Sequence, residues 1–96
     1  MKEHNLEFDW DNSKAETNLT KHGVSFQEAA SVFDDALSIT FPDPDHSVSE
    51  ERLIIIGYSH RGRLLFVSHT DQDDHLRIIS ARETTRPERK VYESVR

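Results

Sequence analysis

The feature of the sequence that most constrains the fold is a run of three apolar segments in its second half, separated only by short turns. The segments cover residues 53–59, 63–70 and 75–82, and residues 60–62 and 71–74 join them. Turns of three or four residues connect neighbouring antiparallel strands. The sequence therefore predicts an antiparallel meander of three strands.

Two further segments alternate between apolar and polar residues. Leu6, Phe8 and Trp10 alternate near the start of the chain, and Leu37, Ile39 and Phe41 alternate before a polar loop at residues 42–51. A period of two residues is typical of a strand with one buried face. We therefore expect one short strand near residue 8 and another that ends at Phe41.

Two helices are predicted between these strands. Ser13-x-x-Glu16 and Ser25-x-x-Glu28 both have the pattern of a capping box, and Gly23 stands where a helix commonly ends. The second helix continues to about residues 34–35 with apolar side chains at helical spacing.

A last helix begins after the meander. Thr85 is its predicted N-cap, Pro87 lies in its first turn and Glu88 stands at the third helical position. The element order is then β-α-α-β-β-β-β-α. With 96 residues the chain forms a single domain, 1–96, of the α+β class, with two N-terminal helices and a C-terminal helix packed on a small antiparallel sheet.

Composition excludes several classes of protein. The chain has no cysteine, which rules out a disulfide scaffold, a thiolate nucleophile and a cysteine-ligated zinc site. Its longest apolar runs, at residues 53–56 and 64–67, are far too short to span a bilayer. Residues 1–5 lack the apolar region of a signal peptide, so we expect a cytoplasmic protein without contact to a membrane.

Charge is distributed unevenly along the chain. The net charge is −6, but residues 1–60 hold twelve acidic and four basic side chains (−8), whereas residues 61–96 hold six acidic and eight basic ones (+2). A phosphate backbone requires local positive charge. The basic C-terminal third fits either a nucleic-acid site or a surface covered by an acidic partner.

His69 and Arg77 are the first candidates for chemistry, because neighbouring strands could place them on one face of the sheet. An imidazole moves a proton near neutral pH, and a guanidinium stabilises charge that develops on a phosphate. The alternative is that both are ordinary solvated residues at strand ends.

Lys14, Lys21 and His22 form a second group on or near the first helix. Residues 14 and 21 are seven positions apart and therefore lie on a similar face two turns apart. They could bind a phosphate, with His22 as acid or base. Alternatively they are solvated, and His22 interacts with the negative end of the helix dipole.

Basic residues also surround the start of the last helix, and Tyr92 follows them. They could grip an RNA backbone while the phenol stacks on a base. The alternative is a solvated face, with Tyr92 docking the helix on the sheet. The basic residues are Arg82, Arg86, Arg89 and Lys90.

No metal or cofactor is expected. Asp43-x-Asp45-His46 is the nearest approach to a metal site, but no fourth ligand lies nearby in the sequence and the spacing is not that of an EF-hand.

An ordered set of short motifs resembles BrnT-type toxins over nearly the whole chain. One departure is Asn12, where such sequences often have proline after the Trp-Asp pair. The motifs are Phe8–Asp11, Lys14, Asn18, Lys21–Phe26, Glu28-Ala29, Val32–Asp35, Pro42-Asp43, Asp45-His46, Glu51-Arg52, Gly57, Gly62–Leu65, His69-Thr70, Arg77–Arg82, Thr85-Arg86, Glu88-Arg89 and Tyr92-Glu93.

The resemblance implies a RelE/ParE-like fold and a toxin of a bacterial type II toxin–antitoxin system, an endoribonuclease that arrests growth by metal-independent cleavage of RNA. It also implies a BrnA-type antitoxin with a ribbon-helix-helix part, a complex that is normally a heterotetramer, and contact with operator DNA only through that antitoxin. The catalytic candidates are then His69, Arg77, Arg82, His22, Lys14 and Tyr92. The candidates for RNA binding are Lys21, Arg63, Arg86, Arg89 and Lys90.

Two other functions stay open at this point. The chain could be a non-catalytic partner and co-repressor of the antitoxin, or it could poison DNA gyrase as ParE-like members of the same fold do. Cleavage of RNA that depends on Arg77 distinguishes the ribonuclease from both.

Overall fold

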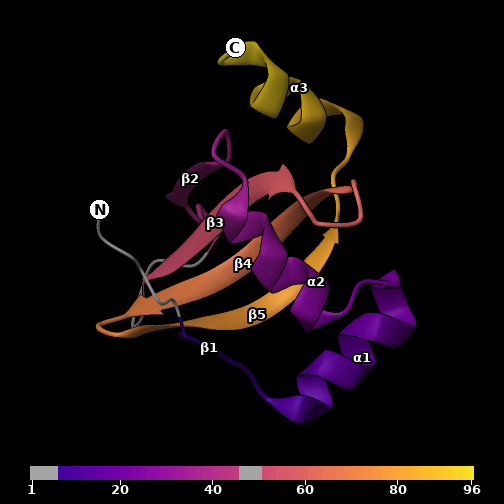
Figure 1. The fold of residues 1–96 in the computed structure, drawn as a ribbon, viewed down its shortest axis with the longest axis vertical. Helices are drawn as coiled ribbons and strands as arrows, with labels where there is room; N and C mark the ends of the chain where they lie inside the picture. The colour runs from indigo at the N-terminus through magenta and orange to yellow at the C-terminus, as the bar shows by residue number, and fades with distance from the viewer. Residues whose placement is uncertain (1–6, 46–50) are drawn as a thin grey trace.

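The computed structural model describes residues 7–45 and 51–96 of the chain. Its elements follow the predicted order, with a short 3-10 helix added after the second helix (Figure 1). The elements are β1 (Glu7–Asp9), α1 (Asn12–His22), α2 (Phe26–Ser31), η1 (Val32–Asp34), β2 (Ile39–Pro42), β3 (Arg52–Tyr58), β4 (Leu64–Gln72), β5 (His75–Glu83) and α3 (Arg86–Ser94).

The five strands form one sheet in the order β1-β5-β4-β3-β2. The predicted meander is confirmed, because β2, β3, β4 and β5 pair antiparallel in sequence order. The α+β class is confirmed as well, but the expectation of a wholly antiparallel sheet is wrong at one pair, since β1 runs parallel to β5. The long connection through two helices and three strands lets β1 return beside β5 in the same direction.

The caps of α1 and α2 differ in part from their predicted form. Asp11, not Ser13, caps α1, and its carboxylate accepts hydrogen bonds from the backbone N–H groups of Ser13 and Lys14 at 2.8 and 3.1 Å. A carboxylate at this position also interacts favourably with the helix dipole, so the aspartate begins the helix earlier than the serine would. Ser25 caps α2 as predicted, but the Glu28 side chain does not complete that box.

The predicted ends of α1 and α3 are confirmed. Gly23 ends α1 with φ of 71°, a left-handed conformation that glycine adopts without strain. At α3 the hydroxyl of Thr85 accepts from the Glu88 N–H and the Glu88 carboxylate accepts from the Thr85 N–H, a complete capping box.

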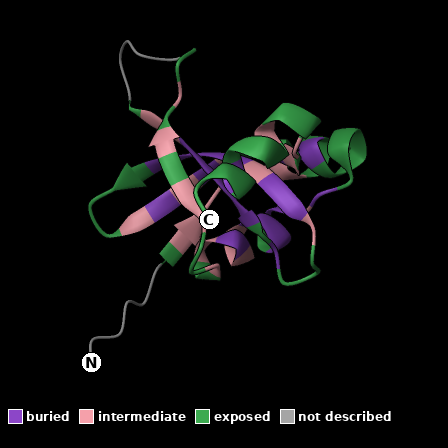
Figure 2. Ribbon diagram, turned by 90° about the horizontal axis from the view of Figure 1, so that it is seen from above, coloured by how far each residue is buried: buried purple, intermediate pink, exposed green. Residues whose placement is uncertain are grey.

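The helices divide the apolar core between the two faces of the sheet. Phe26, Ala29 and Val32 pack on one face, against a cluster that includes Ile55 and Val67. Tyr92 of α3 packs with Ile54, Ile56 and Leu64, which alternate onto the opposite face. Figure 1 shows α2 crossing the sheet, α1 beyond β5 and α3 past the end of that strand. In Figure 2 the buried segments lie along the central strands, and the outward turns of the helices are exposed.

A bulge in β5 decides which of its side chains share a face. Ser68 pairs with Ser80 but His69 pairs with Ile78, so Ile79 is an extra residue without a partner on β4. Because Thr70 pairs with Arg77 and Phe66 with Arg82, residues 77, 80 and 82 all point to the face opposite α2. An unbroken alternation would have turned Arg77 away from Ser80 and Arg82.

Among the described residues, no helix is long and apolar enough to cross a membrane.

Candidate functional site

Helix α1 lies against the edge of β5, past the three residues that pair with β1. The buried side chain of Asn18 holds it there. Its amide nitrogen donates to the carbonyls of Ala81 (2.8 Å) and Val24 (2.9 Å), and its oxygen accepts from the Ala81 N–H (3.1 Å). The side chain thus satisfies both backbone groups of Ala81, as a neighbouring strand would, and fixes α1 on the sheet.

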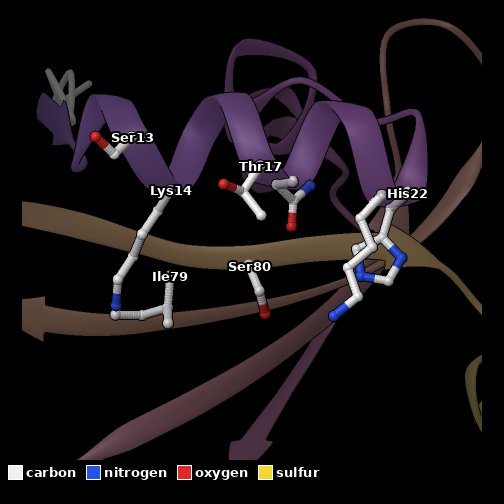
Figure 3. A pocket seen from close by; sticks show the side chains of 8 residues that line it. Ser13, Lys14, Thr17, His22, Ile79 and Ser80 are labelled. Carbon is white, nitrogen blue, oxygen red and sulfur yellow. The ribbon is translucent and has the colours of Figure 1, made fainter.

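A groove of about 270 Å³ opens between α1 and β5. Figure 3 shows Lys14 towards one end of it, His22 towards the other, and Ser80 of β5 between them. The residues that line it include no carboxylate: they are Ser13, Lys14, Thr17, Asn18, Lys21, His22, Ile79 and Ser80. The groove therefore offers positive charge and hydroxyl groups together, a combination that suits a phosphate.

The groove brings together three of the predicted site residues. Lys14, Lys21 and His22 are all exposed, and all three line it. The predicted placement of residues 14 and 21 on one side of the helix is confirmed.

Arg77 and Arg82, two further predicted site residues, do not line the groove. Ser80, which does, lies between them on β5, and the bulge turns all three to one face. Arg77 forms an ion pair with Asp9 at 3.2 Å. Arg82 forms a two-pronged pair with Glu88 at 2.8 and 3.0 Å, and its guanidinium lies 4.2 Å from the centre of the Phe66 ring. The hydrogen bonds from Arg82 lower the pKa of Glu88, so this carboxylate stays charged.

Comparison with known proteins agrees with this architecture. A family model described as "Ribonuclease toxin, BrnT, of type II toxin-antitoxin system" matches residues 10–88, most of the chain and all of the groove. The chain belongs to the BrnT family. It is therefore a member of a family of ribonuclease toxins whose partners are antitoxins.

The structure of this BrnT-family chain also resembles a solved one. The ribonuclease toxin BrnT of Brucella abortus, known from a 1.1 Å crystal structure, superposes with a TM-score of 0.66 and 24% sequence identity. The alignment covers 85% of this chain and 100% of the Brucella chain. At that identity the likeness shows a common fold. No curated protein sequence matches the chain.

His69 does not join the site in this BrnT-family fold, and the expectation that it shares a face with Arg77 is wrong. The bulge places its side chain with Ile78, on the face that α2 covers. It is 2% exposed, its ring lies edge-on to Phe33 at 4.9 Å, and its Nδ1 has no hydrogen-bond partner in the described part of the chain. Burial lowers the pKa of His69, so the ring stays neutral.

Tyr92 lies in α3, away from the residues that line the groove. Its hydroxyl donates to the Asp35 carboxylate at 2.7 Å, and its ring meets Tyr58 edge-on at 5.5 Å. Burial raises the pKa of this phenol. These contacts fit the alternative interpretation, in which Tyr92 docks the helix on the sheet.

Arg63, a predicted RNA contact, instead takes part in a network of hydrogen bonds within the protein. It donates from Nε and Nη2 to the Glu28 carboxylate, and Nη2 also donates to the Gly23 carbonyl at 3.0 Å. Glu28 is 1% exposed, and it also accepts from the Ser59 hydroxyl at 2.7 Å. Hydrogen bonds from Arg63 lower the pKa of Glu28 and hold it charged. Arg63 thus ties the end of α1 to α2 and the sheet.

The remaining predicted RNA contacts, Arg86, Arg89 and Lys90, are exposed on α3. Arg89 donates to the Tyr58 hydroxyl at 3.2 Å. None of the three lines the groove.

Sequence reasoning missed two parts of the site. Asn18 was noticed only as part of a resemblance, although a polar residue on the buried side of a helix is a signal for a buried hydrogen bond. Ser80 was assigned to the right strand but not to the groove, because the bulge beside it leaves no mark in the alternation of residues.

Metal ligation finds no support in the described segments. Within the described segments, residues 7–45 and 51–96, no three His, Asp or Glu side chains lie close enough together to hold a metal ion. His46, of the Asp43-x-Asp45-His46 motif, lies outside the described residues.

Proposed function

We propose that this chain is an endoribonuclease that cleaves RNA in the groove between α1 and β5 without a metal ion. The observation that carries the proposal is the gathering of Lys14, Lys21 and His22 in one groove that has no carboxylate in its lining. Membership of a family of ribonuclease toxins supports the same activity.

Binding of the RNA backbone follows from the cations of the groove. Lys14 and Lys21 stand two helical turns apart, so they can contact two different phosphates along a strand. Arg77 and Arg82 lie three and two residues from Ser80, which places their Cα atoms within about 10 and 7 Å of the Ser80 Cα. Neither lines the groove as it stands, and in this proposal both turn to a phosphate bound over Ser80 once they share or release their partners Asp9 and Glu88.

Cleavage then requires movement of two protons. The 2′-oxygen attacks the adjacent phosphorus, the bond from phosphorus to the 5′-oxygen breaks, and a 2′,3′-cyclic phosphate forms. A base takes the proton of the 2′-hydroxyl and an acid protonates the departing 5′-oxygen. His22 is the imidazole of the groove, and we assign it one of these transfers. Arg77 and Arg82 stabilise the negative charge of the transition state.

The antitoxin controls the activity in this proposal. A BrnA-type antitoxin with a ribbon-helix-helix part binds the chain, blocks cleavage, and brings it to operator DNA in a heterotetramer that represses its own promoter. The net charge of −6 supports contact with DNA through the antitoxin only. The toxin acts in the cytoplasm, where its RNA substrate is.

The test is incubation of the purified chain with a defined RNA in EDTA. We expect cleavage that leaves 2′,3′-cyclic phosphate ends, slowed about 100-fold or more in both His22→Ala and Arg77→Ala. Lys90→Ala removes an exposed cation of α3 that does not line the groove and serves as the control, with cleavage close to that of the wild type. His69→Phe changes a buried side chain on the face that α2 covers, away from the groove, and is expected to retain cleavage too.

Three results would contradict the proposal. Full cleavage by His22→Ala and Arg77→Ala would remove the groove as the site. Cleavage that disappears in EDTA and returns with a divalent cation would show a metal-dependent enzyme. A wild type that binds antitoxin but never cleaves RNA would favour the non-catalytic partner.

A further inference from the structure

Ile79 is an apolar residue in a groove whose lining is otherwise polar. It is half-buried, and it is the extra residue of the bulge in β5, without a partner on β4. Among the described residues that line the groove, every other side chain carries a hydroxyl, an amide, an imidazole or an ammonium group. A phosphate gains nothing from an isoleucine, so Ile79 and the polar lining suit different parts of a bound molecule.

The side chain of Ile79 is not used by the apolar core. Its neighbour Ile78 is buried in the cluster under α2, but Ile79 belongs to neither apolar cluster of the described chain. The edge of β5 is also uncovered at this point, because β1 pairs only with residues 75–77 and Asn18 of α1 binds the backbone of Ala81. The groove opens between these two attachments, so the apolar surface of Ile79 is available to a ligand.

A nucleotide has both of the surfaces that the groove offers to contact. Its phosphate is charged, and the face of its base is apolar and of similar character in all four bases. Figure 3 shows Ile79 beside Ser80 on the strand side of the groove, towards the end where Lys14 lies. Ile79 and Ser80 are consecutive residues with Cα atoms about 3.8 Å apart. One nucleotide can therefore contact both side chains, with its phosphate at Ser80 and its base at Ile79.

We propose that Ile79 is the nucleobase contact of the groove: the face of one base packs on its side chain while the phosphate of that nucleotide lies over Ser80. The inference rests on the proposed function for the place where RNA binds. Ile79 holds the substrate and takes no part in the proton transfers. Because every base has an apolar face, this contact requires a base but does not select one.

The test measures the affinity of full-length variants for two short chains by fluorescence anisotropy. One is a 2′-O-methyl RNA, which is not cleaved, and the other is a 2′-O-methyl sugar–phosphate chain of the same length without bases. Ile79→Val and Ile79→Thr are a matched pair, because both side chains are β-branched, suit a strand and differ by a methyl group against a hydroxyl. We expect Ile79→Thr to bind the RNA about fivefold more weakly than Ile79→Val, and both to bind the chain without bases equally. Leu19→Thr, at an exposed aliphatic residue of α1 outside the groove, is the control and should bind like the wild type.

Several results would overturn the inference. Equal affinity of Ile79→Val and Ile79→Thr for the RNA would show that the apolar surface contacts no base. A loss in Ile79→Thr that is the same for both chains would show that Ile79 shapes the groove without contacting a base. A loss in Leu19→Thr as large as that in Ile79→Thr would place the base contact outside the groove. A wild type that does not bind the RNA at all would remove the contact altogether.

Cleavage of the unmodified RNA by the same proteins separates this inference from the proposed function. If the affinities follow the predicted pattern while the wild type fails to cleave RNA, the ribonuclease proposal fails and the base contact stands. If the wild type cleaves RNA but Ile79→Val and Ile79→Thr bind it equally, the reverse holds. Where both proposals hold, Ile79→Thr raises KM about fivefold over Ile79→Val and leaves kcat unchanged, since a contact made equally in the bound substrate and the transition state affects only KM.

Discussion

Helices α1 and α3 each bury a single residue, α1 against β5 and α3 against β3, but the two residues make different kinds of contact. Asn18 of α1 makes three hydrogen bonds, two of them to the backbone of Ala81 and one to Val24. Tyr92 of α3 packs an aromatic ring on apolar neighbours and donates one hydrogen bond. Hydrogen bonds are directional and fix a register, whereas apolar contact tolerates small shifts.

The difference matches what each helix presents to the outside. If RNA is cleaved in the groove as we propose, Lys14 and His22 must keep a fixed distance from Ser80, and the hydrogen bonds of Asn18 hold α1 at that distance. No residue of α3 lines the groove, so α3 has no such requirement. In the proposed function, α1 is therefore the helix whose position on the sheet matters for the reaction, and α3 is not.

The largest expected effect is on the network that joins the end of α1 to α2. Arg63→Met leaves the buried Glu28 carboxylate without its cation, so the free energy of unfolding in urea should fall by about 3 kcal/mol. Arg61→Met is the matched control, because Arg61 lies 3.8 Å from the same carboxylate but is 64% exposed, and it should change stability by less than about 0.5 kcal/mol. Equal effects of the two substitutions would contradict the assignment of Arg63 as the main partner.

The next effect tests the hydrogen bonds of α1 directly. Asn18→Ala leaves the N–H and C=O of Ala81 unpaired, and we expect a loss of about 2 kcal/mol in the free energy of unfolding. RNA cleavage should fall more steeply than stability, because the wall of the groove is no longer held in register. A variant that remains folded and cleaves at the wild-type rate would show that α1 needs no such fixing.

A smaller effect is expected at the matching position of α3. Tyr92→Phe removes the hydrogen bond to Asp35 and keeps the ring, which should cost about 1 kcal/mol of stability in the same urea experiment. Cleavage should not change, in contrast to Asn18→Ala. Loss of cleavage with the fold intact would return Tyr92 to the catalytic candidates.

The smallest expected effect is on how stability depends on pH, through the buried His69 side chain. The folded state lowers the pKa of His69 because the ring is buried, so the unfolded chain binds a proton more readily than the folded one. Stability should therefore decline as the pH falls from about 7 to 5, and the wild type should lose more than His69→Phe. His75 works in the opposite direction, since its hydrogen bond to Asp74 raises its pKa, and the difference between the two proteins isolates His69. Parallel pH profiles would contradict this.

The sequence predicts the helices and strands better than it predicts the arrangement of the site residues. Alternating residues, the Thr85–Glu88 box and Gly23 each have a local cause, and the structure confirms them. The bulge at Ile79 has no local cause in the sequence. Ile78 and Ile79 are equally suited to either face of the sheet, and only the pairing with β4 decides which of them is buried under α2. That single residue separated His69 from Arg77. It also turned Arg77 to the side of Ser80.

The residues of the first helix were easier to place than those of the sheet. Helical spacing alone put Lys14 and Lys21 on one side, but the strand edge that completes the groove depends on where β1 stops, which is a tertiary property. The capping aspartate was not predicted either, because Asp11 and Ser13 both suit an N-cap and the sequence pattern alone does not decide between them.

One measurement tests the division between α1 and α3 most directly: titration of the isotope-labelled chain with a 2′-O-methyl RNA, which lacks the attacking hydroxyl, followed through backbone amide chemical shifts. We predict that the shifts concentrate in residues 14–22 of α1 and 79–82 of β5 and leave α3 unchanged. Shifts concentrated in residues 86–94, with none along the groove, would contradict the account.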